Sequence, residues 1–75
     1  MKYRGEVVRR RIGRRTKSER VAVMLVTEEG DYVLRQRGGH TFEDPVLEAL
    51  VGRTLEFEGE LSDYTLLVTT WRAPP

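Results

Sequence analysis

The sequence contains no cysteine and only one histidine, His40, among its 75 residues. The lack of cysteine excludes disulfide bonds and every zinc site that uses a thiolate ligand. Long apolar runs are also missing, because the longest, residues 21–26, is far shorter than the ~20 residues that span a bilayer. The first twenty residues are rich in arginine and contain no apolar stretch typical of a signal peptide. We therefore expect a single soluble, cytoplasmic domain over residues 1–75 that does not enter a membrane.

Charge is abundant, and the two signs are unevenly distributed along the chain. Residues 1–20 hold nine basic and two acidic residues, a net charge of +7, whereas residues 21–75 hold four basic and ten acidic residues, a net charge of −6. A basic segment of this kind is typical of a phosphate-binding surface, since Lys and Arg release counterions when they neutralise phosphates. The alternative is that the basic and acidic segments pair with one another within the fold.

The alternation of apolar and polar residues predicts five β-strands. We expect them over residues 3–12, 21–27, 32–37, 55–61 and 64–72. Residues 28–31 are typical of the turn of a β-hairpin, and Gly30 can adopt the positive φ that such a turn requires. Gly59 falls in the apolar register of the fourth strand, which indicates a β-bulge or a sharp bend there.

A short helix is expected over residues 45–51. Asp44 is a good N-cap because its carboxylate accepts hydrogen bonds from free backbone N–H groups, and Pro45 fits the first helical position. Gly52 fits the position that ends a helix. The spacing places four apolar residues on one stripe of this helix: Val46, Leu47, Leu50 and Val51.

The order of three strands, a short helix and two strands resembles the OB-fold, a small five-stranded Greek-key barrel with a helix between strands three and four. Residues 52–61 look like the helix exit and fourth strand of many such domains. The resemblance covers nearly the whole chain but carries no fingerprint of a particular family. An SH3-like barrel is the nearest alternative, although it usually lacks a capped helix here. We therefore predict an all-β fold with one short helix, built as an OB-fold-like barrel.

The resemblance implies that the first strand pairs with the second and the fourth, and that the fifth strand lies beside the third. Opposite charges that face each other across strands contribute roughly 0.2–1 kcal/mol per pair. On this arrangement the arginines of the first strand would lie near the acidic residues of the fourth: Arg9 and Arg11 near Glu56, Glu58 and Glu60.

The connection between the first and second strands is one part of the candidate site. In OB-folds this loop commonly borders the ligand together with the loop between strands four and five. That second loop carries Asp63, which could pair with only one basic residue. The alternative is a solvated loop. The basic residues of the first connection are Arg14, Arg15, Lys17 and Arg20.

The outer face of the second, third and fifth strands is the second part of the candidate site. If Val23, Leu34 and Leu66 point into the barrel, strict alternation places the residues between them outside. Monomers seldom expose a large apolar patch without a use for it. The alternative is that the register differs by one, so that Trp71 belongs to the core. The expected patch, with Arg35 and Arg37 at its rim, comprises Met24, Val26, Val33, Leu67 and Trp71.

Two functions fit this face. The first is binding of single-stranded DNA or RNA, with bases stacked on Trp71 and phosphates along Arg35, Arg37 and the basic loop. The second is a protein interface, as an adaptor or a homodimer, in which Trp71 and Arg35 are residue types that dominate binding energy. We expect the first function and keep the second as the alternative.

No enzyme chemistry can be assembled from the sequence. His40, Glu43 and Asp44 lack the paired spacing of a metal site. Ser18 and Ser62 do not lie in a nucleophile motif. We therefore expect no catalytic activity, no bound metal and no cofactor.

Overall fold

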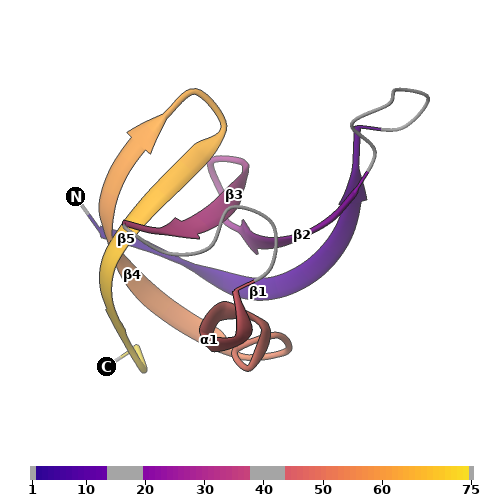
Figure 1. Ribbon diagram of the computed structural model, residues 1–75. Helices are drawn as coiled ribbons and strands as arrows, with labels where there is room; N and C mark the ends of the chain where they lie inside the picture. The colour runs from indigo at the N-terminus through magenta and orange to yellow at the C-terminus, as the bar shows by residue number, and fades with distance from the viewer. Residues whose placement is uncertain (1, 14–19, 38–43, 75) are drawn as a thin grey trace.

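The computed structural model describes residues 2–13, 20–37 and 44–74, which form an all-β fold with one short helix (Figure 1). The expected order of elements is confirmed, and every strand boundary lies within one residue of its expected position. No helix in the described part of the chain is long and apolar enough to cross a membrane. The elements are β1 (Lys2–Ile12), β2 (Arg20–Val26), β3 (Asp31–Gln36), α1 (Pro45–Glu48), β4 (Thr54–Ser62) and β5 (Thr65–Arg72).

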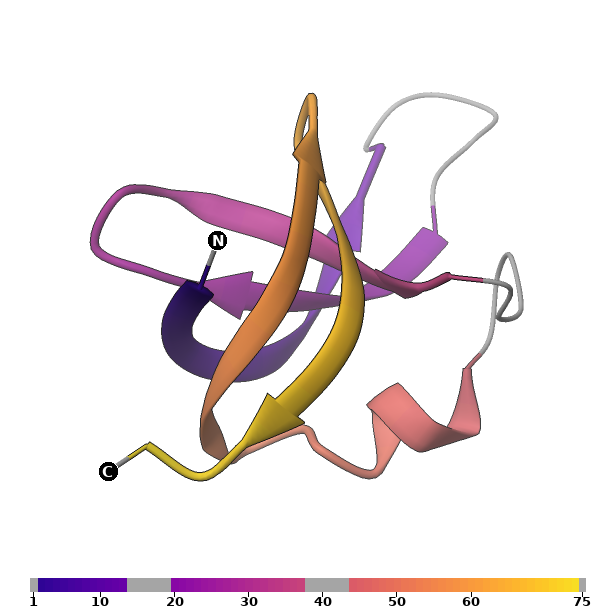
Figure 2. The same cartoon turned by 90° about the vertical axis from the view of Figure 1, so that its left-hand side faces the viewer.

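The five strands close into a barrel in the order β1-β2-β3-β5-β4, with β4 returning to β1. β3 and β5 run parallel, and the other neighbouring strands are antiparallel. The β4–β5 pair crosses the β2–β3 pair steeply (Figure 2). The expected pairing of the first strand with the second and fourth is confirmed, as is the position of β5 beside β3.

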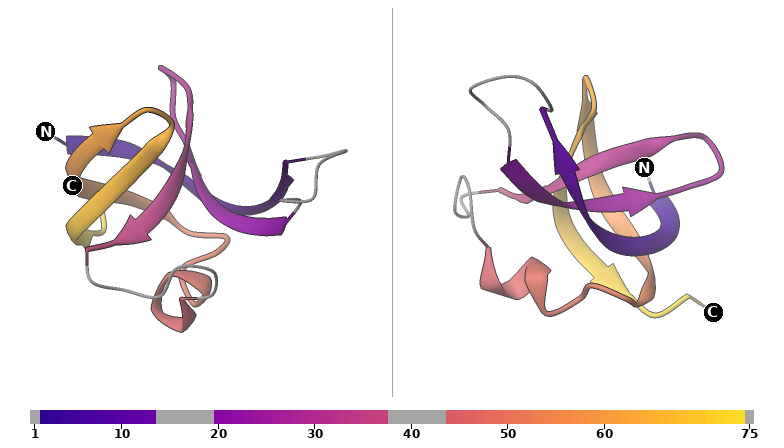
Figure 3. Two further views of the ribbon diagram at one scale, coloured as in Figure 1. Left: turned by 45° about the horizontal axis from the view of Figure 1, so that its top comes forward. Right: turned by 90° about the vertical axis from the view of Figure 1, so that its right-hand side faces the viewer.

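β1 is long and pairs with two neighbouring strands, one after the other. Its first residues pair with β4 and its later residues with β2, and Glu6 has partners on both strands. At Gly5 a Cβ atom would overlap the carbonyl oxygen of Val26, so only glycine fits where β1 bends between the two pairings. β2 and β3 run together from their hairpin and then separate, since their ladder stops at Met24 and Val33 (Figure 3). The end of β1 and the start of β2 consequently project from the barrel as a two-stranded ribbon (Figure 1).

The core is filled by alternate residues of all five strands and by the helical segment. Leu47 and Leu50 are buried, and Val51 packs against the core, as expected. Val46 is 48 % exposed, so its expected place in the apolar stripe is wrong. The regular helix ends at Glu48, so Val46 and Leu50 do not share one continuous helical stripe, and within α1 Val46 lies about 100° around the axis from the buried Leu47. The strand residues of the core are Val7, Val23, Leu25, Leu34, Leu55, Phe57, Leu66 and Val68.

The N-cap of α1 is confirmed and also joins the helix to the sheet. One carboxylate oxygen of Asp44 accepts hydrogen bonds from the backbone N–H of Val46 at 3.0 Å and of Leu47 at 3.4 Å. Its other oxygen accepts a 2.8 Å hydrogen bond from Nε2 of Gln36, at the end of β3. The helix is shorter than expected, but hydrogen-bonded turns continue the chain to Gly52, whose φ is 94°.

Candidate functional site

Trp71 lies on the core side of the sheet and packs against the core. The expectation that Trp71 shares the outer face with Leu67 is therefore wrong. The bulge expected at Gly59 is confirmed, because Glu58 pairs with Thr70 while Gly59 pairs with Val68. This shift leaves one extra residue, position 69, on β5. Because successive side chains alternate between faces, one extra residue reverses the alternation beyond it.

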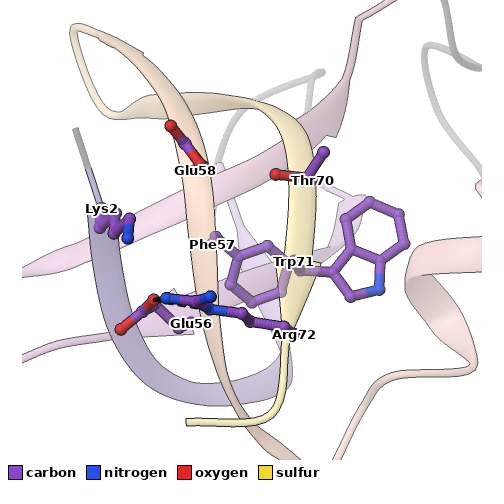
Figure 4. Close-up of a pocket in the computed structure, with 7 residues that line it drawn as sticks. All are labelled: Lys2, Glu56, Phe57, Glu58, Thr70, Trp71 and Arg72. Carbon is purple, nitrogen blue, oxygen red and sulfur yellow. Dashed lines mark hydrogen bonds and ion pairs between the residues drawn. The ribbon is translucent and has the colours of Figure 1, made fainter. Parts of the chain in front are cut away.

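The reversed alternation places Trp71 directly opposite Phe57. Their ring centroids are 5.9 Å apart, and Trp71 packs against the core. Figure 4 shows both rings pointing to the same side of the sheet, while the ion pair between Arg72 and Glu56 lies on the other. Trp71 therefore offers no stacking surface on the outer face of β2, β3 and β5.

The rest of the expected apolar patch is less exposed than predicted. Met24 is only 7 % exposed, although it lies on the face opposite the core cluster. On the same face Arg10 of β1 forms a 2.6 Å ion pair with Asp31 of β3, which spans the intervening strand β2. The remaining members of the patch are half-buried: Val26, Val33 and Leu67.

The expected ion pairs between Arg9 or Arg11 and the acidic face of β4 are wrong. The ladder between β1 and β4 covers only residues 2–6 of β1. Lys2 therefore lies opposite Glu58, and Arg4 lies opposite Glu56. Residues 9 and 11 lie farther along, where β1 pairs with β2 instead. The extent of this ladder depends on where β1 bends.

Several arginines nonetheless form ion pairs with acidic residues, but these acidic residues are not the ones that the sequence predicted. Arg9 donates a 3.0 Å hydrogen bond from Nε to Glu48 of α1. Arg37 lies 3.7 Å from Glu60, with both side chains largely exposed. Exposed pairs of this kind contribute at most about 1 kcal/mol each, because water and salt screen them. Such carboxylates can be replaced by another anion at small cost.

Arg35 differs from these arginines. It lies on β3 opposite Leu67, on the outer face, and its side chain has no hydrogen bond or ion pair with the described residues. Its Nε atom is buried and has no acceptor. A buried donor without a partner costs about 1–3 kcal/mol. An anion that reached this guanidinium could supply the missing acceptor.

Other residues of the predicted site lie outside the described residues. These include Arg14, Arg15 and Lys17; Arg20 begins β2, but its side chain is also outside them. His40 and Glu43 lie outside them as well, whereas Asp44 is the helix cap.

Tyr64 is a strongly exposed aromatic residue that was not predicted from the sequence as part of the site. The residue is 77 % exposed at the turn between β4 and β5, where Asp63 has a φ of 54°. The carbonyl oxygen of Tyr64 accepts a 2.7 Å hydrogen bond from the N–H of Val33, which holds the turn against β3. The position of a bulky aromatic beside the Ser62-Asp63 turn was the available signal.

A hollow of about 170 Å³ lies over β1, β4 and β5 (Figure 4). Its rim carries two carboxylates and two cations, so their charges largely cancel and give no preference for an anion. The residues that line it are Lys2, Glu56, Phe57, Glu58, Thr70, Trp71 and Arg72.

Comparison with known proteins does not assign a family. No protein-family model, no curated protein and no solved structure matches the chain. The function must therefore be inferred from the charge, burial and geometry of this chain's own residues.

Proposed function

We propose that this domain is an OB-fold-like binding module, without catalytic activity, that binds single-stranded nucleic acid on the outer face of β2, β3 and β5. The closed order β1-β2-β3-β5-β4, with α1 between β3 and β4, supports the OB-like assignment. Because a fold alone does not imply a function, the proposal depends on particular side chains.

The observation that carries the proposal is the buried Nε of Arg35, which has no acceptor among the described residues. Arginine presents five donors in a planar fork that matches the oxygens of a phosphate group. Because this Nε is enclosed by the protein, a phosphate would bond it only after the Arg35 side chain turns outward; that movement would give the orphan donor a charge-assisted hydrogen bond. The outer face thus offers an arginine that no carboxylate of the described residues occupies.

The surrounding charge supports the same ligand. Residues 1–20 carry a net charge of +7, and β1 ends at the outer end of the projecting ribbon, where Ile12 pairs with Arg20. On the same face as Arg35, Arg10 pairs with the half-buried Asp31, and Arg37 pairs with the largely exposed Glu60. A phosphate can displace Glu60 from Arg37 at small cost, because both side chains are exposed. The protein-interface alternative has less support, because the apolar patch it requires is largely covered.

A titration with a fluorescently labelled oligothymidine at two salt concentrations tests the proposal. The affinity should fall with salt, with a log–log slope of about 0.7 for each phosphate contact. Arg35→Gln should weaken binding about tenfold or more, the effect of losing a hydrogen bond to a charged group. Arg53→Gln is the control, since it removes the same charge at an exposed position between α1 and β4.

The absence of binding by the unaltered protein at low salt would overturn the proposal. A dimer in sedimentation, lost on Val33→Asp, would instead support the protein interface. Quenching of Trp71 is not an expected signature of binding, because its indole packs against the core.

A further inference from the structure

The aromatic residues of the described chain fall into two groups. Tyr3 and Tyr32 pack edge to face with centroids 5.8 Å apart, and Phe57 packs against Trp71; all four belong to the core or pack against it. Tyr64 exposes 77 % of its surface and has no ring partner within the described ranges. It is the aromatic ring among the described residues that is most accessible to a ligand.

The turn that carries Tyr64 is joined to the strand that carries Arg35. The 2.7 Å hydrogen bond from Val33 places the backbone of Tyr64 beside the first half of β3, and Thr65 is the register partner of Val33. Arg35 follows Val33 on the outer face, and Arg37 comes two residues later. Each step of two residues along a strand is about 6.6 Å. The backbone of Tyr64 therefore lies beside the first half of β3, Arg35 lies in its second half, and Arg37 follows directly after its end.

We propose that Tyr64 stacks against an unpaired base of a nucleic-acid strand whose phosphates contact Arg35 and Arg37. This inference rests on the proposed function and specifies how the bases are held. Stacking between a base and an aromatic ring is tolerant of sequence, since every base has a π-face. In a duplex each base is already stacked and paired, so a ring on an exposed turn favours an unpaired base. The phosphate at Arg37 replaces the long contact with Glu60.

The test compares Tyr64→Ala and Tyr64→Phe on two probes, an oligothymidine and an abasic oligonucleotide of equal length. Tyr64→Ala should weaken binding to oligothymidine about 5- to 150-fold, the range for loss of one base–aromatic stack. Tyr64→Phe should bind like the unaltered protein, because the phenyl ring retains the stacking face. On the abasic probe all three proteins should bind equally, whereas Arg35→Gln should weaken binding to both probes. The melting temperature of each variant, followed by circular dichroism, checks that it is folded.

The outcomes separate the two proposals. If the unaltered protein binds neither probe at low salt, the proposed function fails and the role of Tyr64 fails with it. If it binds oligothymidine but Tyr64→Ala has no effect, only the role of Tyr64 is overturned. Equal weakening of both probes by Tyr64→Ala would show that the residue shapes the turn and does not stack a base. Equal or tighter binding of a duplex of the same length would also overturn the inference.

Discussion

Phe57 of β4 lies directly opposite Trp71 of β5, and their rings pack with centroids 5.9 Å apart. This contact exists because of the register shift between Glu58 and Gly59, which turns Trp71 toward the core. The only tryptophan of the chain is thereby a structural residue that supports the sheet from the barrel side.

Trp71→Ala should lower the free energy of unfolding by about 2–4 kcal/mol, somewhat less than the loss of a fully buried tryptophan. Trp71→Phe should recover most of this stability, since a ring remains to pack against Phe57. Urea denaturation followed by circular dichroism measures both. If Trp71→Ala changes the free energy of unfolding by less than ~0.5 kcal/mol, as an ordinary surface substitution does, the packing of Trp71 against the core is contradicted.

Gly59→Ala should destabilise the protein by about 1–3 kcal/mol, the usual cost of overpacking. A Cβ atom at position 59 would overlap the backbone carbonyl oxygen of Leu67, which cannot rotate away as a side chain can. Glu60→Ala, at the next and exposed position, is the control and should change stability by less than ~0.5 kcal/mol. Thermal unfolding compares the two variants. Equal melting temperatures would show that the bulge relaxes without cost.

Asp44→Ala should cost about 1–2 kcal/mol of stability, because it removes the N-cap of α1. Asp44→Asn should retain most of the cap, since asparagine is an equally good N-cap residue. Gln36→Ala removes only the contact between β3 and the cap. A double-mutant cycle on Gln36 and Asp44, measured in urea, should therefore show coupling between them, and strict additivity would contradict the hydrogen bond.

Leu50→Ala should cost about 2–5 kcal/mol, the range for deletion of a buried leucine side chain. Val46→Ala should change stability by less than ~0.5 kcal/mol, because Val46 faces solvent. The pair tests which side of the helical segment covers the barrel. Similar losses in urea denaturation for the two variants would show that Val46 also packs in the core.

The local features of the fold could be read from neighbouring residues. The helix cap at Asp44, the turns at Gly30 and Gly52, and the bulge at Gly59 all depend on backbone chemistry within a few positions. Strand boundaries follow from alternation over similarly short distances. These predictions hold because the tertiary contacts at these positions are compatible with the local backbone preferences.

The composition of the outer face was decided by the tertiary structure. One extra residue on β5 reversed the orientation of Trp71, and the bend of β1 moved Arg9 away from β4 to Glu48. Neither effect is visible along the chain, because the faces and partners of a strand depend on ladder extents set by packing between distant segments. For the same reason the sequence could show that the N-terminal segment is basic, but only the folded barrel leaves Arg35 with a buried donor that has no acceptor in the described part of the chain.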